Sequence, residues 1–300
     1  MDQETAVPCW IPVLGMHRSG TSALTRGLLT LGVQLGAHLM EPMPSVNPKG
    51  FWEDMDIYQL NEAMLQSLDS QWYHSTPLSS EQIAQLVDAG FLEQAVALLQ
   101  SKHQEGQPYA FKDPRLCRLL AFWQQALARA GGKIAYCLAL RNPVSIADSL
   151  QKRDGMDRTQ SYLLWLTHTL NSILLTHGQV RILVNYDHLI QAPGAQMRRM
   201  AAGLHLSIEE AALREYAEDF LDKTLRHTRH TQTDLKQDPD CPPMVQSLYR
   251  DLLAVAEDRK ALDTPALLQR HQRAWKDLQT MRPLLQAMDR MVEALLQPAS

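Results

Sequence analysis

The sequence has few cysteines, no long apolar run and no excess of positive charge. Its four cysteines are spread over 300 residues and form no Cys-x-x-Cys pair, which argues against a metal site or a disulfide framework. Reduced thiols, as in a cytoplasm, are therefore expected. The formal net charge is −4, whereas proteins that bind nucleic acid usually carry a basic excess. Any anion site must be local, and no nucleic-acid partner is predicted.

Signals for secretion and membrane insertion are also lacking. No apolar stretch approaches the ~20 residues that are needed to span a bilayer. Residues 1–5 are polar and acidic and lack the basic and apolar regions of a secretory signal. These absences predict a cytoplasmic protein without a membrane span. With 45% hydrophobic residues, the chain can form one large core, alone or with a helical annex.

Short apolar segments alternate with helical segments along most of the chain. Residues 10–14 are apolar and β-leaning, and a helical pattern over 21–31 follows them. Further strands are predicted at 109–111, 134–140 and 181–185, and helices at 116–130 and 144–176, the last with a break near Gly155. This alternation predicts an α/β fold with a P-loop-like parallel sheet flanked by helices. Ligands in such folds bind at the carboxyl ends of the strands.

The remaining segments are predicted to be loop or helix. Residues 37–54 are rich in Pro, Asn and Gly, and long loops of this kind are often functional. Helices are predicted at 56–68, 80–102, 207–221 and 244–297. A turn or linker at 238–243 separates a domain over 1–237 from a helical C-terminal extension over 238–300. The extension is expected to pack on that domain or to self-associate.

A glycine-bounded turn joins the first strand to the first helix. Its sequence is Gly15-Met16-His17-Arg18-Ser19-Gly20-Thr21-Ser22. Glycines let backbone N–H groups curl around an anion, and the following helix directs its positive dipole end there. A nucleoside-triphosphate P-loop carries Lys where Thr21 stands, and the cation here is Arg18 instead. An anion site is predicted, ATP or GTP hydrolysis is disfavoured, and a turn without a ligand is the alternative.

This turn resembles the phosphosulfate loop of the sulfotransferase superfamily, whose donor is 3′-phosphoadenosine 5′-phosphosulfate (PAPS). That loop carries Lys or Arg followed by Ser/Gly-Gly-Thr, as in Arg18-Ser19-Gly20-Thr21. The resemblance implies that Arg18 contacts the phosphosulfate and stabilises the departing charge. It also implies that Ser19, Gly20, Thr21 and Ser22 supply backbone and hydroxyl donors. The matching motifs extend over about residues 10–235.

A second motif follows the strand at 134–140. Arg141 stands at the strand end, and Ser149 lies eight positions later in the next helix. An Arg at a strand end is by itself usually a solvated or paired surface residue. The family binds the 3′-phosphate with an Arg at a strand end and a Ser eight positions later. The resemblance therefore implies this role for Arg141 and Ser149.

Phe111-Lys112-Asp113-Pro114-Arg115 forms a third motif. Pro114 favours a helix start, and Asp113 can be its N-cap. Tyrosylprotein sulfotransferases carry a similar Lys-Asp-Pro, with the Lys near the reacting sulfuryl group. The resemblance therefore assigns Lys112 to catalysis.

The loop over 37–54 contains a candidate general base. A carboxylate can accept the proton that the acceptor hydroxyl loses. Carbohydrate and tyrosylprotein sulfotransferases use a Glu between the phosphosulfate loop and the Lys motif, and Glu53 lies in that interval. A solvated loop carboxylate is the alternative, with Asp54 and Asp56 as competitors. His17 and His103 stay open because many small-molecule sulfotransferases use a His.

Two further segments match the family more loosely. Tyr186 begins a Tyr-Asp-His-Leu run that resembles the family's Tyr-Glu-Asp-Leu, whose Tyr packs near adenine. The basic run at 225–230, which includes Arg229, falls where the family often has a loop that closes over the nucleotide. A solvated helix end is the alternative there. The chain lacks the Arg-Lys-Gly ending of the cytosolic small-molecule enzymes.

Together these motifs predict a PAPS-dependent sulfotransferase that needs no metal, because side chains supply the cations. The acceptor is a hydroxyl of a glycan or small metabolite, or of a peptide tyrosine. A kinase with a divergent loop is one alternative. Such a kinase would need an acidic residue at the end of a strand, and Asp187 is a weak candidate for it. A catalytically idle nucleotide-binding scaffold is another. The C-terminal helices could also form a homo-oligomer.

Overall fold

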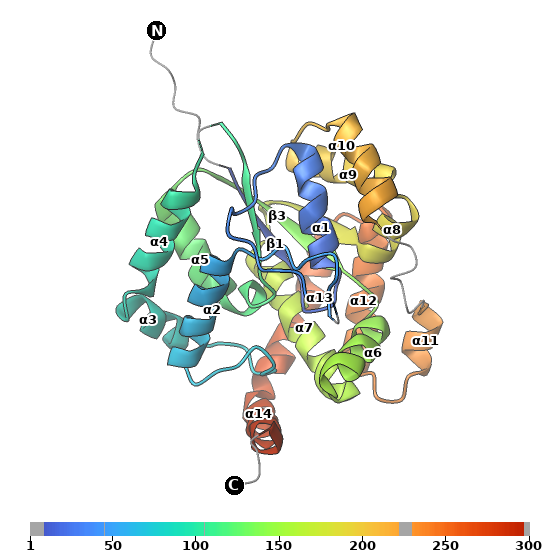
Figure 1. The fold of residues 1–300 in the computed structure, drawn as a ribbon. Coiled ribbons are helices and arrows are strands. Elements are labelled where there is room, and N and C mark those ends of the chain that lie inside the picture. The colour runs from blue at the N-terminus through green and yellow to red at the C-terminus, as the bar shows by residue number, and fades with distance from the viewer. Residues whose placement is uncertain (1–8, 45, 105, 222–229, 297–300) are drawn as a thin grey trace.

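The computed structural model describes residues 9–44, 46–104, 106–221 and 230–296. Within these ranges, four strands form one sheet in the order β2-β1-β3-β4 (Figure 1). They are β1 (Cys9–Leu14), β2 (Tyr109–Lys112), β3 (Lys133–Leu140) and β4 (Val180–Asn185). Every pairing is parallel, so the carboxyl ends of the strands meet at one edge. The predicted α/β fold with a parallel sheet is confirmed.

Apolar side chains cover both faces of this sheet. Along β1, Trp10 and Leu14 belong to one core, and Ile11 and Val13 belong to the other. Successive side chains of a strand point to opposite faces, so a continuous apolar run supplies both cores. This explains why the strands lack a polar-apolar alternation.

Helices form a layer on each face (Figure 1). The core of Ile11 and Val13 packs against α1 (Thr21–Leu28), α8 (Tyr186–Gln191), α9 (Pro193–Leu204) and α10 (Glu210–Glu215). The core of Trp10 and Leu14 packs against α2 (Met55–Ser67), α3 (Ser80–Asp88), α4 (Phe91–Lys102), α5 (Leu116–Ala130), α6 (Pro143–Asp154) and α7 (Arg158–Leu175).

Glycines set two of the helix limits. Gly155 has a φ of 68° and ends α6, which confirms the predicted break. The prediction of one helix over 80–102 was wrong, because Gly90 has a φ of 82° and separates α3 from α4. A residue in the left-handed region ends an α-helix, and glycine adopts this region without steric cost.

The C-terminal part forms four helices where one long helical segment and a turn were predicted. They are α11 (Gln232–Gln237), α12 (Pro243–Ala256), α13 (Pro265–Thr280) and α14 (Arg282–Leu296). Helix α12 lies against β4 and α7, and α13 lies against α7. The domain boundary at 237/238 stays a prediction. No helix of the described ranges combines the length and apolar character needed to cross a bilayer.

The two-sided core leads to a stability prediction. Leu138 on β3 is 2% exposed, whereas Val180 on β4 is 41% exposed. We expect Leu138→Ala to lower the free energy of unfolding by about 2–5 kcal/mol, because it leaves a cavity in the core. Val180→Ala should change it by no more than about 0.5 kcal/mol. Urea unfolding measures both, and equal effects would contradict this description of the core.

Candidate active site

The loop between β1 and α1 has an unusual backbone. Arg18 and Gly20 both have positive φ angles, of 67° and 88°. The Ser19 side chain turns inward, and its hydroxyl donates to the Met16 carbonyl over 2.6 Å. A Cβ atom at Gly15 would lie 2.7 Å from the Ser19 Oγ. The glycine frame of the sequence is thus required by close packing inside the loop.

Gly20 is the point where the loop meets Tyr186. A Cβ atom at Gly20 would lie 2.2 Å from the Tyr186 ring, so only glycine fits between them. The Arg141 guanidinium stands 4.9 Å from the centroid of the same ring. Arg141 also donates from Nη1 to the Arg18 carbonyl over 2.8 Å. Three predicted motifs therefore meet at the carboxyl edge of the sheet.

Arg18 connects the loop to α6. Its Nε donates to the Ser149 Oγ over 2.7 Å. Burial, together with the nearby positive charges of Arg153 and Arg141, lowers the pKa of Arg18 to about 10. Crowded, desolvated cations favour a bound anion, because an anion would relieve their mutual repulsion.

Glu53 and Lys112 form a buried ion pair beside these cations. Their Oε1 and Nζ atoms are 2.5 Å apart, and the two residues are 6% and 2% exposed. Burial raises the pKa of Glu53 above its ordinary value, although the Lys112 charge opposes this shift. The structure brings the predicted base and the predicted catalytic lysine into direct contact.

The loop that carries Glu53 is bound to the start of α1. Asn47 donates from Nδ2 to the Gly50 carbonyl over 2.6 Å and to the Ser22 Oγ over 3.3 Å. Ser22 in turn donates to the Phe51 carbonyl over 3.1 Å. These bonds hold the Glu53 segment in register with the glycine loop.

The acidic and histidine residues that are alternatives to Glu53 as the general base lie at different positions. Asp54 is the N-cap of α2 and also bonds Tyr109 and Lys102, which is a structural role. His103 packs on Trp10, outside the cavity. His17 does line the cavity, where burial lowers its pKa well below the ordinary value and keeps the ring neutral.

A cavity of about 990 Å³ contains most of the predicted site residues. Those that line it are Arg18, Gly20, Thr21, Ser22, Glu53, Lys112, Arg141, Ser149 and Tyr186. Ser19 does not, since its hydroxyl is buried within the loop. Arg229 lies outside the described residues.

Several cations line the cavity that the sequence did not single out. They are Lys49, Arg115, Lys152 and Arg153. Two of them had a readable signal. Arg115 directly follows Lys-Asp-Pro, and Arg153 stands four positions after Ser149, on the same face of α6. Apart from Glu53, Asp148 is the only carboxylate that lines the cavity in the described part of the chain.

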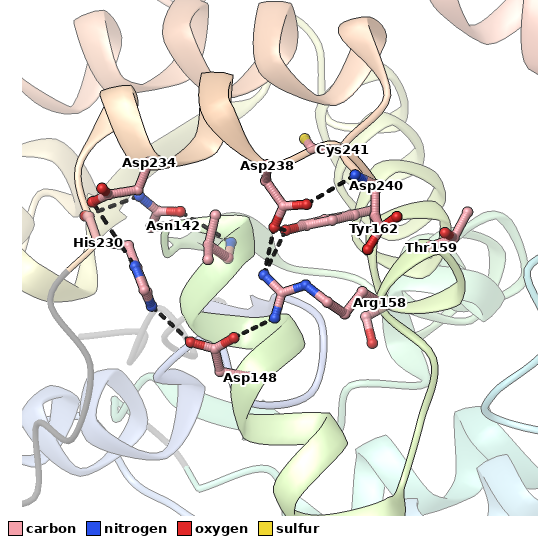
Figure 2. Close-up of polar contacts among 12 residues, drawn as sticks. Asn142, Asp148, Arg158, Thr159, Tyr162, His230, Asp234, Asp238, Asp240 and Cys241 are labelled. Carbon is pink, nitrogen blue, oxygen red and sulfur yellow. Dashed lines mark hydrogen bonds and ion pairs between the residues drawn. The ribbon is translucent and has the colours of Figure 1, made fainter.

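Asp148 joins the cavity wall to the chain beyond residue 229. Figure 2 shows its carboxylate between His230 and Arg158, with His230 Nε2 2.6 Å from Oδ2. Arg158 also donates to Asp238 over 2.5 Å. Because Asp148 precedes Ser149 on α6, this network fixes the position of Ser149 relative to the 230–238 segment.

Comparisons with known proteins concern the fold. A scan against family models and a search of curated proteins found no match. Solved structures are similar at low identity. The sulfotransferase domain of the Synechococcus PCC 7002 olefin synthase has 18% identity and a TM-score of 0.43, over 86% of this chain and 96% of its own.

Two other structures complete this finding. The sulfotransferase domain of the curacin biosynthetic pathway has 16% identity and a TM-score of 0.42, over 93% of this chain and 99% of its own. Retinol dehydratase, in complex with androsterone and the inactive cofactor PAP, has 10% identity and a TM-score of 0.33, over 90% of this chain and 80% of its own. At this similarity any activity has to be inferred from the cavity residues.

The contact between Gly20 and Tyr186 leads to a prediction with a matched control. Gly20 and Gly32 both have positive φ angles, but a Cβ atom at Gly32 would meet nothing within 4 Å. Gly32→Ala should therefore cost only the backbone strain, about 1–2 kcal/mol. Gly20→Ala should cost more, because the new Cβ atom would overlap the Tyr186 ring, and urea unfolding can measure both losses. Equal losses in the two variants would show that the loop does not pack as described.

Proposed function

We propose that this protein transfers a sulfuryl group from PAPS to an acceptor hydroxyl. The observation that carries the proposal is the bond between Arg18 and Ser149, residues that are 131 positions apart. This bond unites the glycine loop with the second anion motif, in the order and places expected of a phosphosulfate nucleotide site. Arg141 and Tyr186 complete the same corner.

In this proposal the nucleotide lies along the carboxyl edge of the sheet. The loop N–H groups and the start of α1 receive the 5′-phosphosulfate, because a helix N-terminus favours negative charge. Arg141 and Ser149 hold the 3′-phosphate. Tyr186 packs beside the adenine. Arginine suits both phosphates, since its guanidinium can donate two parallel hydrogen bonds to one group.

The chemical step follows from the Glu53–Lys112 pair. Glu53 accepts the proton of the acceptor hydroxyl while the acceptor oxygen bonds to sulfur and the bond from sulfur to the bridging oxygen breaks. Lys112 has three N–H donors, so it can keep its bond to Glu53 and also donate to a sulfuryl or bridging oxygen. Arg18 stabilises the charge that develops on the leaving phosphate. Positioned charges of this kind need no metal.

Several classes of acceptor are compatible with this reaction. Phe51 lines the cavity and Trp52 does not. The Trp52 indole donates to the Lys49 carbonyl and packs on Phe220, which itself lines the cavity. Only Phe51 of this aromatic pair is therefore placed to contact an acceptor. A glycan, a small metabolite or a peptide tyrosine each offers a suitable hydroxyl.

The two alternatives have weaker support. A P-loop kinase would need a lysine where Thr21 stands and an acidic group at the phosphates. Asp187, its candidate, does not line the cavity. An idle scaffold predicts nucleotide binding without transfer to any acceptor.

Titration calorimetry with 3′-phosphoadenosine 5′-phosphate (PAP) tests the nucleotide site. We expect micromolar affinity for PAP, and a loss of at least about tenfold in Arg141→Ala, because a hydrogen bond to a charged group is worth about 1.5–3 kcal/mol. Arg250→Ala removes an exposed arginine on α12 and should leave the affinity unchanged. Binding of Mg-ATP instead of PAP would favour the kinase.

The raised pKa of Glu53 leads to a pH prediction. The base must be ionised, so activity with PAPS should fall as the pH decreases through a value above that of an ordinary glutamate, about 4.3. Glu53→Gln should lower kcat by about 10²–10⁴-fold and keep PAP binding. An acid limb near 4 or an active Glu53→Gln variant would exclude Glu53 as the base.

A further inference from the structure

Exposed apolar side chains are concentrated at one place on the described part of the chain. The described residues include six exposed large apolar side chains, and two of them, Met43 and Val180, are isolated from the others. The other four belong to α14 or directly precede it. They are Met281, Leu284, Met291 and Leu295, with exposed fractions of 39%, 59%, 66% and 84%. Single exposed apolar residues are normal, but a contiguous group marks an interaction site.

The spacing of these residues is that of a coiled-coil seam. With the half-buried Met288, they occupy positions 281, 284, 288, 291 and 295. The steps are three, four, three and four residues, which is the a/d pattern of two heptads. A strict a/d stripe is narrower than the apolar face with which a helix packs on a globular core. We call these five residues the α14 seam.

A different face of α14 attaches the helix to the protein. Arg282 donates to the Pro77 carbonyl over 3.0 Å, and Leu285 is fully buried. Asp289 accepts from the Ser75 N–H over 2.7 Å, and Glu293 lies 2.9 Å from the His74 Nε2. These four residues share one side of the helix. Their contacts fix its rotation, so that Met281, Leu284, Met291 and Leu295 stay exposed, whereas Met288 in the middle of the seam packs partly against the hydrophobic core.

Figure 1 shows α14 at the lower end of the molecule, apart from the sheet. Residues of α14 do not line the 990 Å³ cavity. The α14 seam is thus separate from the nucleotide and acceptor site. Its role does not depend on the proposed function.

We propose that the α14 seam pairs with the α14 seam of a second copy of this chain. A two-fold interface uses the same patch on both subunits and must be complementary to itself, as two identical a/d stripes are. Leu285, which flanks the seam on one side, is buried in the attachment, and the other flanking positions are uncharged: Ala287, Val292 and Ala294. Two copies can therefore meet without bringing like charges together, and the small alanines permit a close approach.

The size of the seam sets the strength of this pairing. Helix α14 has 15 residues, so it is about 22 Å long. Such a helix pair buries less than the roughly 800 Å² per partner of a standard stable interface. The dimer is therefore weak and depends on protein concentration, in the micromolar range.

Sedimentation velocity of the full chain from about 2 to 200 μM tests this proposal. We expect a reversible shift from a monomer of 34.0 kDa towards a dimer. Leu284→Glu places a charge in the seam and should keep the protein monomeric at all these concentrations. Gln286→Glu makes the same charge change at an exposed position outside the seam and should dimerise like the unmodified chain.

Met291→Glu provides a second variant in case Leu284→Glu fails to fold, and the circular dichroism melting curve checks each variant. A chain that stays monomeric at 200 μM would overturn the proposal. So would folded seam variants that dimerise as strongly as the unmodified chain, since another surface would then be responsible. PAP binding should be equal in all the variants, which separates this result from a failure of the proposed function.

Discussion

The rest of the site depends on two hydrogen bonds. One joins Arg18 to Ser149, and the other joins Arg141 to the Arg18 carbonyl. They place two guanidinium groups close together in a partly desolvated corner, where burial and like charge already lower the pKa of Arg18 to about 10. Proteins seldom keep such crowded cations without an anion to stabilise them. These crowded cations support the proposal that the phosphates of a nucleotide bind at this corner.

The remaining parts are held relative to this corner. Gly20 admits the Tyr186 ring, and the Asn47 and Ser22 bonds tie the Glu53 loop to the same turn. Glu53 then reaches Lys112 at the end of β2, the strand next to β1. The proposed general base, the proposed catalytic cation and the proposed anion site thus line one cavity. Their arrangement requires no movement of a whole domain.

Much of this arrangement could be predicted from the sequence, because it depends on local signals. Apolar runs located the strands, helical periodicity located helices, and the two glycines Gly15 and Gly20 located the loop. The order β2-β1-β3-β4 could not be predicted, since alternation of strands and helices does not specify which strands are neighbours. Ser19 faces inward because its hydroxyl finds the Met16 carbonyl, a choice that its residue type does not reveal. The attachment of α14 was equally hidden, as Asp289 and Ser75 are 214 positions apart.

A crystal structure of the protein with PAP would show directly whether the nucleotide binds at this corner. We expect the 3′-phosphate within hydrogen-bonding distance of Arg141 and Ser149, and the 5′-phosphate at the N–H groups of the loop that ends at Ser22. Adenine should lie beside Tyr186. PAP bound elsewhere, or in this cavity without contact to Arg141 and Ser149, would contradict the assignment of the site.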